Sequence, residues 1–201
     1  RTYLPNLEIQ NFDLSNDDLD SVFNAGEIIG VGATTLTNIL IHLERIYCNS
    51  IGIEYMYIRT PERIQWIQEK LNHNSNSPNF SKDQKKQILK KTIEAVAFEK
   101  FLHTKYVGQK RFSLEGGEAL IPALDALIEK AANDGVREFI VGMSHRGRLN
   151  TLTNIFGKPV EDIFNEFDGK DYEEKAFDGD VKYHLGWTSN RQTDSGLKVF
   201  M

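Results

Sequence analysis

Apolar residues in the first half of the chain recur three and four positions apart, which is the spacing of amphipathic helices. Helices are predicted within residues 34–48, 60–71 and 81–103. The second of these opens with Thr60 as an N-cap and Pro61 at the first helical position, and the polar stretch 72–79 that follows it has no periodicity. Residues 1–105 are therefore predicted to form a mainly helical unit.

The pattern changes in the second half, where glycines become frequent. Residues 137–143 form a short, nearly continuous apolar run, as expected for a buried parallel strand. Helices are predicted on both sides of this run, within residues 116–133, 148–157 and 159–167. Because helix, strand, loop and helix in this order are typical of an α/β domain, we predict the α/β fold class. Residues 106–201 are expected to begin such a domain, with a parallel sheet and a boundary near Tyr106.

Composition and charge limit the classes of protein that fit. A net charge of −5 over 201 residues argues against a dedicated nucleic-acid-binding protein, which usually carries a basic surface. Cys48 is the single cysteine, so no disulfide forms within the chain. No apolar run approaches the roughly 20 residues of a membrane span, so no membrane partner is expected. Since the sequence begins at Arg1 and stops after a strand-like run, we expect it to be part of a longer protein.

The stretch GMSHRGRLN, residues 142–150, follows the predicted strand directly and concentrates positive charge in a loop. Ligands of open α/β sheets bind beyond the carboxyl ends of the strands. Arg146 and Arg148 lie where a helix is expected to begin, and positive charge there opposes the helix dipole. This placement favours an anionic ligand beside His145, for which guanidinium groups are suited. The alternative is a solvated loop whose arginines pair with carboxylates, and the residues alone leave both interpretations open.

Two further stretches carry candidate chemistry. His184 lies between Tyr183 and Leu185, which suggests a partly buried imidazole. It could serve a site, or it could be a core histidine that bonds a backbone carbonyl. In QKRFSLEGGEALIP, residues 109–122, acidic side chains precede a helix, and the favoured interpretation is a helix-entry turn. No phosphate-binding loop of the G-x-x-x-x-G-K-[ST] type occurs in the sequence.

Three ordered strings together resemble one family: FLHTKYVGQKRFSLEGGEALIPALD, GMSHRGRLNTLTNIFGKPVEDIFNEF and GDVKYHLG. They are similar to the E1 component of the 2-oxoglutarate dehydrogenase complex, a thiamine-diphosphate-dependent decarboxylase. The resemblance extends over the whole chain and is densest between residues 98 and 186. It implies that the chain is an N-terminal part of such an enzyme, and that residues 106–201 begin its thiamine-diphosphate-binding domain.

The resemblance also implies roles for individual residues. Arg146 matches an arginine that contacts the diphosphate of the cofactor. His145 and His184 match histidines that line the active centre, and His184 matches the one that contacts the 2-oxo acid. The Mg²⁺ and diphosphate motif of the family, GDG followed by an asparagine, lies further downstream and is absent here, so this stretch alone is not expected to hold the cofactor firmly. Arg148 receives no role.

The reaction and partners follow from the same resemblance. In the tricarboxylic acid cycle, the family decarboxylates 2-oxoglutarate and passes the succinyl group to the lipoyl group of the E2 dihydrolipoyl succinyltransferase. The E3 lipoamide dehydrogenase completes the complex, and the E1 is a homodimer of the bacterial cytoplasm or the mitochondrial matrix. A 2-oxoadipate dehydrogenase E1 is the close alternative, because one methylene changes binding by only about 1–3 kcal/mol. A non-catalytic helical module with a phosphate-binding basic loop is the alternative from another class.

Overall fold

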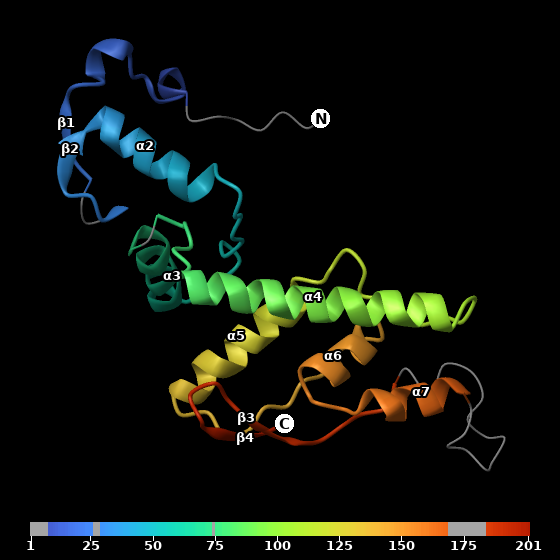
Figure 1. Ribbon diagram of the computed structural model, residues 1–201. Coiled ribbons are helices and arrows are strands. Elements are labelled where there is room, and N and C mark those ends of the chain that lie inside the picture. Colours follow the sequence, from blue (N-terminus) through green and yellow to red (C-terminus); the bar gives the residue numbers. More distant parts are fainter. Residues whose placement is uncertain (1–7, 26–28, 74, 169–183) are drawn as a thin grey trace. The chain divides into compact units, whose positions relative to one another are not determined.

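The computed structural model describes residues 8–25, 29–73, 75–168 and 184–201, and these fold into two compact units, residues 1–80 and 81–201 (Figure 1). Helix α4 (Lys82–Lys105) belongs to the second unit because it packs on helices α5 (Leu120–Asn133) and α6 (Arg148–Asn154). The predicted boundary near Tyr106 concerns the domains of the whole protein and stays a prediction. None of the helices in the described ranges has the length and apolar character needed to cross a membrane.

The first unit is a small helical assembly with one antiparallel strand pair. Its elements are the 3-10 helices η1 (Ile9–Phe12) and η2 (Asn16–Asp18), strands β1 (Val22–Asn24) and β2 (Ala33–Thr35), and helices α2 (Leu36–Tyr47) and α3 (Pro61–His73). Ile46, Tyr55 and Leu71 form its buried core. The side-chain amide of Asn76 donates to the carbonyls of Ile46 and Ile51, both at 2.8 Å, and so ties the end of α3 to the end of α2. Both helices predicted in this unit are confirmed.

The second unit is built on the long helix α4. Ser81 and Gln84 form a reciprocal capping box at its start, which satisfies two backbone N–H groups. The remaining elements are helix α7 (Val160–Asp168) and strands β3 (Asn190–Gln192) and β4 (Lys198–Phe200). One apolar cluster lies between α4, α5 and β4, and it includes Ala95, Ile121, Ile128 and Val199. A second joins α4 to α7 and includes Phe98, Leu102, Ile163 and Phe167.

Buried charges connect the strands of this unit to α5. The Arg191 guanidinium in β3 lies 2.5 Å from an oxygen of the buried Asp125 and 2.9 Å from an oxygen of Glu129. Lys91 of α4 approaches the same Asp125 carboxylate at 3.7 Å. Because buried charges are tolerated when they are paired, this cluster fixes β3 against α4 and α5.

The predicted parallel strand at residues 137–143 is not formed. Both sheets of the described residues are two-stranded and antiparallel, and the 137–143 run contributes one isolated parallel bridge, Glu138 to Phe200. The physical reason is the lack of a neighbouring strand along the rest of the run: Ile140 is 90 % exposed and its backbone pairs with no strand of the described chain. An apolar run becomes a strand only where a partner supplies the ladder hydrogen bonds.

Candidate active site

A tight turn before α6 carries His145 and Arg146. The backbone N–H of Gly147 donates to the carbonyl of Phe112 at 2.9 Å, and that of Arg148 donates to the carbonyl of His145 at 3.1 Å. Gly147 adopts φ of +75°, and a Cβ placed there would lie 2.5 Å from Leu114 Cδ1. The positive φ favours glycine, and a Cβ at this position would force the Leu114 side chain to move. The turn is thus locked against the loop that contains Phe112 and Leu114.

A buried polar network fixes that loop and α6 onto α4. One carboxylate oxygen of Glu99 accepts from the backbone N–H of Leu114 at 3.1 Å and from the side-chain amide of Asn150 at 3.0 Å. The same Asn150 amide donates to the carbonyl of Ala95 at 3.0 Å. Sequence reasoning did not single out Glu99 or Asn150. The available signal was a polar residue inside an apolar helical face, since Glu99 is flanked by the buried Phe98 and Leu102.

The structure brings His145 and His184 together. Their ring centroids are 5.7 Å apart with planes at 79°, although 38 residues separate them in the sequence. His145 stacks on Phe112 with a centroid distance of 3.8 Å, so its ring orientation is fixed by an aromatic neighbour. His184 is exposed in the described chain, which is not the environment of a core histidine. Phe112 is a contact of this pair that sequence reasoning did not identify.

Arg146 and His145 lie on an open depression of about 580 Å³, which Phe112, Ser113 and Glu115 also line. One terminal nitrogen of the exposed Arg146 donates to the carbonyl of Glu115 at 3.1 Å. No carboxylate of the described residues pairs with this guanidinium, and its other N–H groups have no partner there. The alternative of a loop whose arginines pair with carboxylates therefore finds no support in these contacts. Arg146 therefore presents to the depression N–H donors that no residue of the described chain accepts.

Arg148 has a different environment from Arg146. Its two terminal nitrogens donate to backbone carbonyls, one to His184 at 2.9 Å and the other to Met143. Its side chain therefore connects the loop that precedes His145 to the segment that carries His184. Arg146 alone of the two arginines opens onto the depression.

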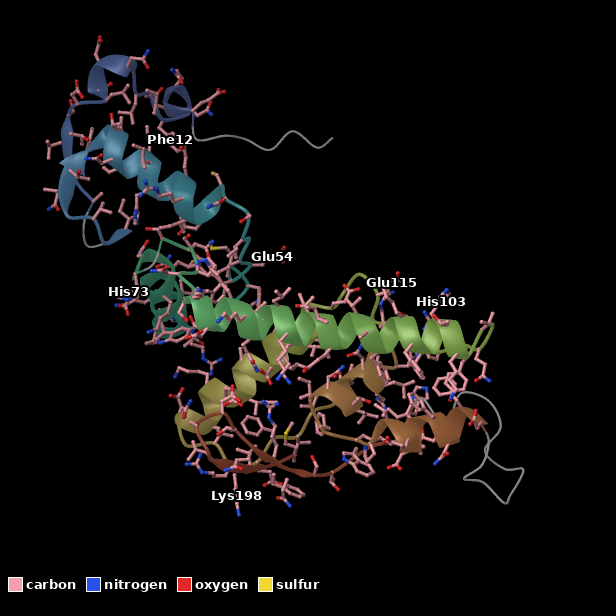
Figure 2. All side chains as sticks on the ribbon, viewed as in Figure 1. Phe12, Glu54, His73, His103, Glu115 and Lys198 are labelled. Atoms are coloured by element: carbon pink, nitrogen blue, oxygen red, sulfur yellow. The ribbon has the colours of Figure 1, made fainter. Side chains whose placement is uncertain are left out.

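A second, smaller cavity of about 120 Å³ lies on the α4 side of the loop, where Figure 2 shows Glu115 and His103 on the same side of the helix. Charges of both signs line it, and Arg111 Nε lies 3.7 Å from Glu99 Oε2. At its edge Glu118 accepts from the backbone N–H of Gly116 at 3.0 Å, and this bond lowers the pKa of the Glu118 carboxyl. This geometry supports the predicted helix-entry turn. Within the described ranges, no group of three or more histidine, cysteine, aspartate and glutamate side chains could hold a metal ion.

Known proteins match the chain along nearly its whole length. The family model described as "Dehydrogenase E1 component" matches residues 90–195. The 2-oxoglutarate dehydrogenase E1 component of Cupriavidus necator is 46 % identical over 197 residues, which are 98 % of this chain and 21 % of that protein. The proteins of the same name from Azotobacter vinelandii and Brucella anthropi are each 43 % identical over 98 % and 97 % of this chain.

This chain spans about a fifth of the length of those relatives. The family match takes in more than half of its residues. The glycine turn, the paired histidines and Arg146 all lie inside the matched range. On this evidence the chain belongs to the dehydrogenase E1 component family.

Proposed function

We propose that this chain is part of a thiamine-diphosphate-dependent enzyme that decarboxylates 2-oxoglutarate and transfers the succinyl group to the lipoyl group of an E2 succinyltransferase. The observation that carries the proposal is the position of His145, whose ring lies 5.7 Å from that of His184 and which lines one depression together with Arg146. The relatives named 2-oxoglutarate dehydrogenase E1 component favour 2-oxoglutarate over 2-oxoadipate as the substrate. A non-catalytic phosphate-binding loop gives no reason for two imidazoles beside the arginine.

The residues present fit the cofactor that this proposal requires. Arg146 is exposed and retains N–H donors that no described residue uses, so it can hold an oxygen pair of a diphosphate. Bound thiamine diphosphate would supply the carbanion chemistry that decarboxylation needs. We assign the Mg²⁺ ligands to residues outside this chain, in a GDG motif followed by an asparagine. The full-length protein should contain that motif, and its absence would argue against the enzyme.

The two histidines would act on the substrate. Imidazole N–H groups can donate to the carboxylate of a 2-oxo acid and stabilise negative charge that develops on its oxygen. An imidazole can also move a proton at a reacting oxygen. We assign the substrate contact to His184, which is exposed, and a supporting position to His145, whose ring is held by Phe112.

The same proposal covers the assembly. We propose that residues 137–143 become a strand of a parallel sheet when further strands of the whole protein pair with them, since Ile140 is 90 % exposed in the described chain. A homodimer, with E2 and the E3 lipoamide dehydrogenase as partners, is the assembly we expect.

Steady-state assays of the full-length protein with 2-oxoglutarate, 2-oxoadipate and pyruvate test the substrate. A preference for either of the other two acids would contradict the assignment.

Arg146→Ala in the full-length protein should weaken thiamine diphosphate binding. A charge-assisted hydrogen bond contributes about 1.5–3 kcal/mol, so the dissociation constant should rise roughly ten- to hundredfold. Calorimetric titration with thiamine diphosphate at saturating Mg²⁺ measures the change. Lys100→Ala is the control, because it removes the same charge from the second cavity. Equal affinity of Arg146→Ala and the unmodified protein would remove Arg146 from the cofactor site.

A further inference from the structure

Arg148 connects two segments that are distant in the sequence. It is the first residue of α6, and its guanidinium donates to the carbonyl of Met143 and, at 2.9 Å, to the carbonyl of His184. Met143 lies two residues before His145, in the loop that leads into the glycine turn. One planar side chain therefore fastens the main chain on both sides of the histidine pair.

The hydrogen bond to the His184 carbonyl is separate from the other hydrogen bonds that hold residues 184–189. Further along, Ser189 Oγ donates to the carbonyl of Phe156 at 2.6 Å, and the backbone N–H of Ser189 donates to the carbonyl of Met201 at 2.9 Å. At the histidine end of the described segment, the His184 carbonyl accepts a hydrogen bond from Arg148. The separation of the two rings, 5.7 Å between centroids, thus depends on where Arg148 places the His184 backbone.

We propose that Arg148 is a positioning residue: it holds the His184 main chain against the loop of His145 and so sets the distance between the two imidazoles. This inference rests on the proposed function, in which both histidines serve the 2-oxo acid. Arginine suits the task because its rigid fork reaches two acceptors at once, whereas the single ammonium of lysine is a point donor on a flexible stem. Both terminal nitrogens are occupied by carbonyls, and the Nε atom is buried, so the side chain does not open onto the depression.

Arg148→Lys in the full-length protein tests the proposal, since it keeps the charge and removes the bridge. Misplacing a reacting group by about 1 Å costs on the order of a hundredfold in rate, so turnover of 2-oxoglutarate should fall by roughly that factor. Thiamine diphosphate affinity should stay near that of the unmodified protein, because Arg146 is untouched. Arg137→Lys is the matched control: Arg137 also spans two backbone carbonyls, those of Ala132 and Val136, at 2.6 and 2.9 Å.

Combining the substitution with His184→Ala separates positioning from general damage. If Arg148 acts through His184, Arg148→Lys should add little to the loss already caused by His184→Ala. Full additivity of the two losses, or a turnover of Arg148→Lys equal to that of Arg137→Lys, would overturn the proposal. Arg148→Gln gives the same comparison if the lysine variant is poorly folded.

The kinetics of His184→Ala and Arg148→Lys together distinguish a failure of the positioning role of Arg148 from a failure of the proposed function. A normal turnover in His184→Ala would overturn the substrate role of His184, and with it the role of Arg148 as its positioning residue. A loss in His184→Ala together with a normal Arg148→Lys would leave the function in place and overturn the role of Arg148 alone.

Discussion

His184→Ala in the full-length protein is expected to abolish most of the turnover of 2-oxoglutarate while thiamine diphosphate still binds. A positioned imidazole that moves a proton in the transition state contributes roughly 10²- to 10⁴-fold to the rate. His184 is exposed, with its ring centroid 5.7 Å from that of His145, so its removal leaves the neighbouring fold intact. The diphosphate contact that we assign to Arg146 is unchanged. Steady-state kinetics with 2-oxoglutarate, together with a cofactor titration, measure both effects.

His103→Ala is the matched control for this substitution. His103 is an exposed histidine on α4 that lines the second, smaller cavity and not the depression of His145 and Arg146 (Figure 2). The control should have the turnover and the cofactor affinity of the unmodified protein. Kinetics of His184→Ala that match those of His103→Ala would show that His184 takes no part in the reaction. A loss of cofactor affinity in His184→Ala would instead move this histidine to the diphosphate.

The helices could be predicted because their signals are local. Pro61 is the first residue of α3, as the sequence predicts, and α4 begins at Lys82, within the predicted range 81–103. Element ends were less predictable: α5 begins at Leu120, later than the glycine pair suggested, because Gly116 has φ of +86° and the backbone turns there. A local turn closes there with the bond from Gly117 N–H to the carbonyl of Leu114 at 2.8 Å, and the helix starts only after it.

The parallel strand at residues 137–143 was not predictable in the same way. An apolar run indicates only that a segment is favoured in a buried position. Whether the segment pairs as a strand depends on strands elsewhere in the chain. Here Phe139 donates to the carbonyl of Phe200 at 2.9 Å, and Phe200 donates to that of Arg137 at 2.8 Å. Two bonds to one end of β4 do not extend into a ladder, so the rest of the run lacks partners in the described chain.

Part of the candidate site could be predicted from local sequence, and part of it depends on the fold. His145, Arg146 and Arg148 are neighbours in sequence, so their grouping needed no fold. The approach of His184 depends on the fold of the whole second unit, and periodicity gave no indication of it. The contacts of the two arginines also differ only in the folded chain. Arg148 donates to two backbone carbonyls, whereas Arg146 lines the depression. Residue type alone cannot separate a ligand contact from a structural bridge.

Gly147→Ala should destabilise the second unit and disturb the site at the same time. A non-glycine residue in the left-handed region costs about 1–2 kcal/mol, and Gly147 has φ of +75°. The new Cβ would also lie 2.5 Å from Leu114 Cδ1, and such overpacking typically costs about 1–3 kcal/mol. Together these terms predict a loss of about 2–5 kcal/mol. Because the turn carries His145 and Arg146, weaker thiamine diphosphate binding should accompany the lower melting temperature.

Gly157→Ala separates the cost of the left-handed backbone from the cost of the contact with Leu114. Gly157 has φ of +70°, but no atom lies within 4 Å of the Cβ that alanine would add. This control should therefore carry only the cost of the left-handed backbone, with a smaller drop in melting temperature and unchanged cofactor affinity. In Gly147→Ala, a second substitution, Leu114→Ala, removes the clashing Cδ1 atom, so the double variant should be more stable than the sum of the two single losses indicates. Equal destabilisation by Gly147→Ala and Gly157→Ala, or strict additivity with Leu114→Ala, would show that the contact between the added Cβ and Leu114 does not destabilise the turn.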